Sequence, residues 1–125
     1  MTLPPDICEN GFEATARDSA VPSGITVSMR GEADMRAKPH LRGFFATVHA
    51  TAVERRSDVR VDIRALSFMN SSCLQEFVVW MAALAAIPVD SGYKIVFLSD
   101  ANQYWQRRSL PPLLTLAPGR VLVES

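Results

Sequence analysis

The residues best suited to regulated chemistry in this sequence are two neighbouring serines, Ser71 and Ser72, flanked by Asn70 and Cys73. They lie between a run typical of a β-strand and a run typical of a helix. Ser72 and Gln75 have the spacing of a capping box, in which each side chain satisfies a backbone amide at the start of a helix. This spacing predicts a structural role for Ser72 and leaves the Ser71 hydroxyl available for modification.

Phosphorylation is the modification that this position of Ser71 favours. A phosphate brings a charge of about −1.5 to −2, which the positive end of a helix dipole accommodates. The same charge would disrupt a partner packed on that surface, so we predict a reversible switch at Ser71, with Ser72 as the alternative residue. The simpler interpretation is that Asn70 and the two serines only shape the turn, because serines that cap helices are common.

Cysteine at the start of a helix offers a different chemistry, because the helix dipole lowers the pKa of a thiol there. An enzyme would use Cys73 as the nucleophile and His40 or His49 as the base. Both histidines fall in an earlier helical pattern, and nothing in the sequence places either beside Cys73. The sequence also lacks a nucleotide-binding loop, paired catalytic carboxylates and a cluster with metal-ligand spacing. We therefore expect no catalysis, no metal and no cofactor.

The helix after the serines carries a second signal, an apolar patch on the side away from its core-facing stripe. At about 100° per residue, Gln75, Glu76, Val79 and Trp80 turn away from that stripe. Exposed Val and Trp beside a switchable serine predict a docking surface, since Trp is enriched among residues that anchor interfaces. The alternative is that Trp80 folds back on its own domain, under Pro111-Pro112.

Composition places these residues in one soluble domain. The chain has 125 residues, 48% of them hydrophobic and 21% charged, which suits a single packed core. Thirteen basic residues balance thirteen acidic ones, so net charge gives no reason to expect nucleic acid or an anionic membrane as a partner. Residues 1–10 lack the features of a leader peptide and are expected to form a flexible segment. No run is long enough for a membrane helix, and two unpaired cysteines suit a reducing cytoplasm.

Hydrophobic periodicity predicts the elements that position the serines. Apolar and polar residues alternate over residues 25–30 and 59–65, as expected for strands with one buried face. Helical spacing begins near Lys38 and again after Ser72. Further strands are expected at 12–17, 95–98 and 120–123, and a turn at Pro22-Ser23-Gly24 joins the strand at 12–17 to the one at 25–30. A helix is expected at 102–108, and Pro111-Pro112 would interrupt it.

This order predicts an α/β fold, a mixed sheet of four to five strands. Strands joined through helices are expected to be parallel, and the first pair forms a hairpin. Because two strands alternate cleanly, we expect the helices to pack on one face only. The domain spans residues 1–125.

From Gly24 onward the chain resembles the STAS family, which includes bacterial anti-sigma factor antagonists and the tails of sulfate transporters. Gly31-Glu32-Ala33-Asp34 looks like the family's Gly-Glu-x-Asp, and Val61-Asp62-Ile63 looks like its central strand. Phe68-Met69-Asn70-Ser71-Ser72 resembles the end of that strand and the Asp-Ser-Ser-Gly turn. In the antagonists, the first serine of the pair is phosphorylated by a kinase that is itself the anti-sigma factor, and a phosphatase reverses the reaction. By motif position this serine is Ser71.

The chain departs from the family pattern at three places. Asn70 stands where the family has Asp, so the side chain can cap a helix but carries no charge. Cys73 replaces a glycine and adds bulk where a partner's backbone would approach. The sequence ends just after its last expected strand, without the closing helix of most family members, which would leave apolar sheet surface for another subunit.

The resemblance and the residue patterns together predict a phosphorylation-controlled protein-binding switch in bacterial signalling. The expected partners are a regulatory Ser/Thr kinase or anti-sigma factor and a cognate phosphatase, with a homodimer possible. The alternatives are a scaffold or transport-accessory module that needs no phosphate, and an enzyme built on Cys73. Besides the switch serine, the partner surface is predicted to include Asp34, Asn70, Cys73, Gln75, Glu76, Val79 and Trp80.

Overall fold

A six-stranded sheet forms the centre of the protein. The computed structural model describes residues 2–20 and 23–125. The strands lie in chain order across the sheet. The β1–β2 and β2–β3 pairs are antiparallel, and the pairs from β3 to β6 are parallel. They are β1 (Ile7–Glu9), β2 (Phe12–Ala20), β3 (Ser23–Ala33), β4 (Val59–Met69), β5 (Ile95–Leu98) and β6 (Val121–Glu124). The predicted mixed α/β fold is therefore confirmed, with one strand more than expected.

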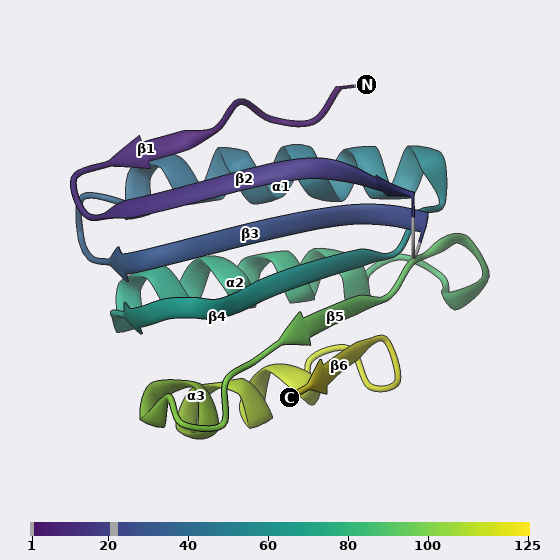
Figure 1. Ribbon diagram of the computed structural model, residues 1–125. Helices are drawn as coiled ribbons and strands as arrows, with labels where there is room; N and C mark the ends of the chain where they lie inside the picture. The colour runs from purple at the N-terminus through teal and green to yellow at the C-terminus, as the bar shows by residue number, and fades with distance from the viewer. Residues whose placement is uncertain (1, 21–22) are drawn as a thin grey trace.

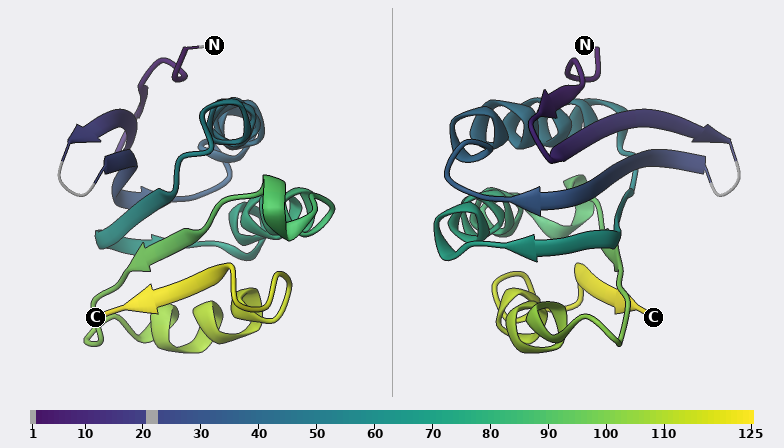
Figure 2. Two further views of the ribbon diagram at one scale, coloured as in Figure 1. Left: turned by 90° about the vertical axis from the view of Figure 1, so that its right-hand side faces the viewer. Right: turned by 60° about the vertical axis from the view of Figure 1, so that its left-hand side comes forward.

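The helices follow the parallel strands. They are α1 (Lys38–Arg55), α2 (Ser71–Ala85) and α3 (Tyr104–Leu114), with a short 3-10 helix η1 (Val89–Ser91). Figure 1 shows α1 and α2 side by side behind the sheet, and the edge-on view in Figure 2 shows both on the same face. Helix α3 lies at the β6 end of the sheet. We call the face under α1 and α2 the covered face and the opposite one the uncovered face.

Residues that alternate along the strands divide between these two faces as the sequence predicted. Val59, Val61 and Ile63 of β4 are fully buried on the covered face, while Arg60 and Asp62 between them are partly accessible. The core between sheet and helices is aromatic at its centre. Phe45 of α1 stacks on Phe77 and Trp80 of α2, with ring centroids 5.0 and 4.9 Å apart.

The N-terminal segment differs from its prediction. Residues 1–10 were expected to be flexible, yet Ile7–Glu9 form β1, which pairs with β2 through the register Ile7↔Ala14. Burial of the Ile7 side chain on the core explains the difference, because one apolar residue in a short polar segment gives no periodicity to detect. The predicted turn residue Pro22 lies outside the described residues.

Helix α3 passes through Pro111 and Pro112, so the prediction that these prolines interrupt it is wrong. Proline removes the hydrogen bond to the carbonyl four residues earlier. Here those carbonyls belong to Arg107 and Arg108, which lie on the exposed side of the helix, where water can replace the lost donors. The apolar side of the helix, Leu110 and Leu113, stays buried.

The first turn of α3 also completes the sheet. Strand β5 pairs only with the first part of β4, as far as Asp62↔Leu98. Beyond that point the Gln106 side chain donates to the Ile63 carbonyl at 2.6 Å, and Trp105 Nε1 donates to the Leu66 carbonyl at 2.9 Å. Gln106 also donates to the Leu66 carbonyl, at 3.2 Å, so side chains of α3 supply donors to β4 where β5 no longer reaches. They hold the second half of β4, which leads into the serine pair, in place.

Candidate functional site

The serine pair lies where β4 ends and α2 begins, at the carboxyl edge of the parallel strands, as predicted. Asn70 is the N-cap of α2, and its Oδ1 accepts a hydrogen bond from the Cys73 amide at 2.9 Å. The Asn70 amide in turn donates to the Ala33 carbonyl of β3 at 3.0 Å. The prediction that Ser72 and Gln75 form the cap is therefore wrong, because the helix begins two residues earlier than a cap at Ser72 requires, and Asn70 occupies the cap position.

Ser71 and Ser72 occupy the first two positions of α2, and they differ in accessibility. Ser71 is exposed, and among the described residues its hydroxyl makes no side-chain hydrogen bond. Ser72 is half-buried, and its carbonyl accepts a hydrogen bond from Lys38 Nζ at 3.3 Å. Of the two serines, Ser71 is therefore the more accessible to a modifying enzyme.

We expect Asn70→Ala to lower the free energy of unfolding by about 1 kcal/mol, the usual cost of losing an N-cap side chain. Asn70→Asp should retain that stability, because a carboxylate accepts the same bond and favours the helix dipole. Urea unfolding measures both. Gln103→Ala is the matched control, since Gln103 is the N-cap of α3 but makes no side-chain cap bond. Equal losses at Asn70 and Gln103 would contradict the capping role.

Cys73 is fully buried, and its Sγ donates to the Asp34 carbonyl at 3.2 Å. Burial raises the pKa of the Cys73 thiol above its usual 9.0, so the thiol is protonated near neutral pH. The two histidines are engaged elsewhere, His40 with Glu9 and His49 with Tyr93. The structure therefore argues against Cys73 as a nucleophile and also removes it from the predicted partner surface.

Asp34 follows β3, in the loop that lies beside Asn70. Its carboxylate accepts from the Arg36 side chain at 2.9 Å and from the Arg36 amide at 2.9 Å. The side-chain hydrogen bond from Arg36 is the main reason that the pKa of Asp34 lies below its usual value. Asp34 is half-buried and engaged within its own loop, whose shape it fixes.

Glu76 was predicted to be on the partner surface, and this prediction is wrong. Its side chain is 2% exposed and lies between Lys38 and Arg42 of α1. Arg42 Nε donates to it at 2.8 Å and Lys38 Nζ at 3.2 Å. Hydrogen bonds from Arg42 and then Lys38 hold the pKa of Glu76 below its usual 4.5 although burial opposes them. Glu76 thus joins α2 to α1.

Trp80 is also buried, at 2% exposure, so its prediction as an exposed anchor is wrong. Its ring stacks on Phe45 at 4.9 Å, and its Nε1 donates to the Tyr93 hydroxyl at 2.7 Å. The alternative that Trp80 folds back on its own domain is correct, and the residues seen against it are Phe45, Phe77 and Tyr93.

The exposed side of α2 forms an uncharged ridge that starts at Ser71. Gln75 and Val79 lie on it as predicted, and Val79 is 40% exposed. The only ionisable carboxylate of α2 is the buried Glu76, so the ridge carries no charge. Its exposed residues are Ser71, Gln75, Val79, Ala82 and Ala85, together with the C-cap residue Ala86. We call this set the α2 ridge.

Sequence patterns missed one exposed apolar residue close to the serines. Met35 is 62% exposed in the loop between β3 and α1, and it lines a shallow groove together with Lys38, Arg42 and Glu76. The local signal was present, since Met35 falls between the polar residues Asp34 and Arg36, outside any apolar stripe. An isolated methionine in a turn is easily overlooked because it belongs to no periodic pattern.

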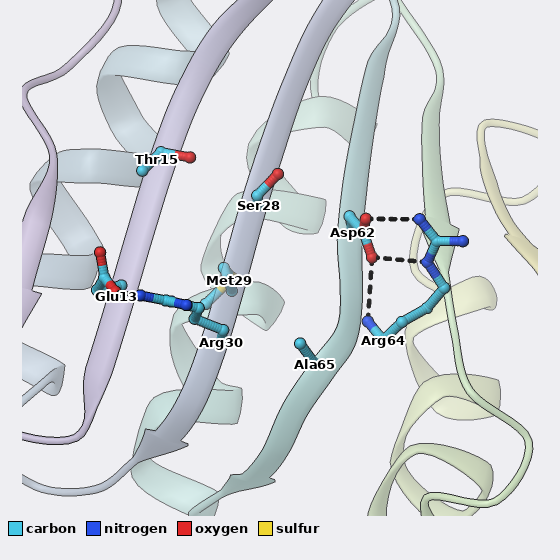
Figure 3. A pocket seen from close by; sticks show the side chains of 8 residues that line it. All are labelled: Glu13, Thr15, Ser28, Met29, Arg30, Asp62, Arg64 and Ala65. Atoms are coloured by element: carbon cyan, nitrogen blue, oxygen red, sulfur yellow. Dashed lines mark hydrogen bonds and ion pairs between the residues drawn. The ribbon is translucent and has the colours of Figure 1, made fainter.

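The uncovered face has a hollow of its own, beside an irregularity in the pairing of β3 and β4 (Figure 3). Arg64 Nη2 bonds Asp62 at 2.8 Å there, and Arg30 is paired with Glu13. Each guanidinium is therefore neutralised by a carboxylate, and the hollow offers no free charge to a ligand. Among the described residues no group of three metal-ligating side chains occurs, and no helix has the length and hydropathy to cross a membrane.

Comparison with known proteins is informative at the level of the fold. No protein-family model matches the sequence, and no curated protein sequence matches it. A solved structure titled as an anti-sigma factor antagonist from Mycobacterium paratuberculosis superposes with a TM-score of 0.65 at 18% identity. The match covers 94% of this chain and 90% of the other. The protein therefore has the fold of an anti-sigma factor antagonist, as the STAS resemblance predicted.

Proposed function

We propose that the protein is a binding module whose contact with a regulatory partner is controlled by phosphorylation of Ser71. The observation that carries this proposal is the position of Ser71, which is exposed at the start of α2 and at one end of the uncharged α2 ridge. The fold, shared with an anti-sigma factor antagonist, supports a regulatory role. The partner is a Ser/Thr kinase or anti-sigma factor in the bacterial cytoplasm, and a phosphatase resets the switch.

A phosphate on Ser71 has a large effect because the α2 ridge has no charge of its own. A partner complementary to this ridge presents uncharged and apolar groups. A phosphate with a charge of about −1.5 to −2 at one end of such an interface would have to lose its water when the complex forms, and this loss weakens binding. The free protein tolerates the same charge for two reasons. The Asn70 side chain bonds only the Cys73 amide in the first turn of α2, and the positive end of the α2 dipole faces the phosphate. Phosphorylation therefore releases the partner and leaves the domain folded.

Incubation with the candidate kinase and ATP, followed by mass spectrometry, is expected to locate phosphate on Ser71. Ser71→Asp should bind the partner roughly tenfold or more weakly than the unsubstituted protein does, because the substitution places a charge in an apolar contact. Ser71→Ala should bind normally and resist the kinase. Calorimetry with the purified partner measures both affinities.

Ser91→Asp is the matched control, because Ser91 is also exposed but lies in η1, beyond the other end of α2. It should bind as the unmodified protein does. Normal binding by Ser71→Asp, together with no phosphate on either serine of the pair, would instead identify a permanent scaffold.

A further inference from the structure

Lys38 contacts the first turn of α2 from a partly exposed position outside the core. It is the first residue of α1, and its side chain is 35% exposed. Its Nζ donates to the Ser72 carbonyl at 3.3 Å and to Glu76 Oε2 at 3.2 Å, so it connects the start of α1 to the first turn of α2. Both bonds are long for a charged donor, and one of them goes to a neutral carbonyl that water could serve as well.

Glu76 does not depend on Lys38 alone. Arg42 donates to it twice, from Nε at 2.8 Å and from Nη2 at 3.3 Å. Two cations thus share one carboxylate, and the cluster carries one positive charge in excess. Arg42 by itself provides the two-bonded geometry that guanidinium and carboxylate prefer. Lys38 can therefore leave Glu76 without exposing a buried charge that lacks a partner.

We propose that Lys38 binds the phosphate of Ser71, leaving Glu76 to Arg42 and exchanging the Ser72 carbonyl for phosphate oxygens. The inference rests on the proposed phosphorylation of Ser71 and adds the residue that receives it. Consecutive Cα atoms are about 3.8 Å apart, so the phosphate is attached one residue from the carbonyl that Lys38 already contacts. The ammonium has three donors on a flexible four-carbon chain, which suits this exchange.

The neighbouring cation does not compete for this role. Arg36, in the same loop, is bound to Asp34 through both its side chain and its amide. The excess charge of the Lys38, Arg42 and Glu76 cluster also offsets the repulsion that Glu76 would exert on a phosphate nearby. Phosphorylation consequently produces a defined contact between α1 and α2 at the end of the α2 ridge.

Nuclear magnetic resonance of the protein with phosphoserine incorporated at position 71 tests the proposal. Lys38 and Lys94 are the two lysines in the sequence, so selective ¹³C labelling gives two side-chain signals. The Lys38 signal should shift on phosphorylation, and that of Lys94, which precedes β5 at the opposite edge of the parallel strands, should not. By ³¹P titration, Lys38→Met should raise the second pKa of the phosphate by about 0.5 pH unit, because it loses a nearby cation.

Lys94→Met should leave the phosphate pKa unchanged, and Lys38→Arg should restore it. An unshifted Lys38 signal in the unsubstituted phosphoprotein overturns the inference even if a variant fails to fold. A phosphate pKa that does not respond to the Lys38→Met substitution overturns it as well. Because the phosphate is installed during synthesis, neither result depends on whether the kinase modifies Ser71, which is tested separately.

Discussion

Gly31→Ala should destabilise the protein by about 3–5 kcal/mol, the sum of backbone strain and overpacking. Gly31 has a φ of +92°, and a Cβ built on it would lie 2.0 Å from the Gly11 carbonyl oxygen. That carbonyl also accepts the Glu32 amide at 2.8 Å, so the turn between β1 and β2 cannot move away without losing a bond. Since domains of this size have about 5–15 kcal/mol in total, the thermal midpoint should fall by roughly 10 °C or more.

Gly43→Ala is the matched control. Gly43 lies inside α1, and a Cβ added to it would meet no neighbouring atom within 4 Å, so alanine there should stabilise the helix by about 1 kcal/mol. Calorimetric melting of the two variants measures the difference. Similar effects from both substitutions would mean that the turn at Gly11 yields to a side chain, and that Gly31 is dispensable.

Gly31 also shows why the motif that carries the family resemblance could be recognised from sequence. Gly31, the first residue of Gly31-Glu32-Ala33-Asp34, must be glycine because of its positive φ and the nearby Gly11 carbonyl, and Asp34 fixes a loop by accepting from Arg36, two residues later. Requirements of this kind leave a trace in the sequence because they act on one position at a time. The alternating strands β3 and β4 were predictable for a similar reason, since burial there follows a period of two.

The orientation of α2 could not be predicted in the same way. Its buried residues follow helical spacing, but their arc is rotated from the predicted one, because α2 packs on α1 as well as on the sheet. The predicted arc was centred on the apolar residues Leu74, Phe77, Val78 and Met81, and that choice turned Glu76 and Trp80 outward. Their partners, Tyr93, Lys38 and Arg42, come from segments far along the chain. The buried set is Cys73, Glu76, Phe77, Trp80, Met81 and Leu84.

In the candidate site, too, features that depend on one element were predicted and the helix start was not. Exposure of Ser71, Gln75 and Val79 depends mainly on their own helix, and the sequence predicted it correctly. The cap at Asn70 was missed because Ser72 and Gln75 match a capping pattern equally well by spacing. Only the observed start of α2 decides between the two residues.

Glu76→Gln should lower the free energy of unfolding at neutral pH by about 1–2 kcal/mol, since the amide loses two charge-assisted interactions. The cost stays below that of breaking a fully buried pair because the cations left behind reach solvent, Arg42 at 65% and Lys38 at 35% exposure. Glu32→Gln is the control, because Glu32 is exposed, and it should change stability by less than about 0.5 kcal/mol.

The pH dependence of this loss identifies the charge as its cause. Because Arg42 and Lys38 hold the pKa of Glu76 below 4.5, the folded state favours the ionised carboxylate. Its contribution is therefore complete above pH 4.5 and disappears as the pH falls through the lower pKa of the folded state. Urea unfolding of the unsubstituted protein and Glu76→Gln should give stabilities that converge in acid. A difference that stays constant down to about pH 3 would show that packing of the side chain, and not its charge, joins α2 to α1.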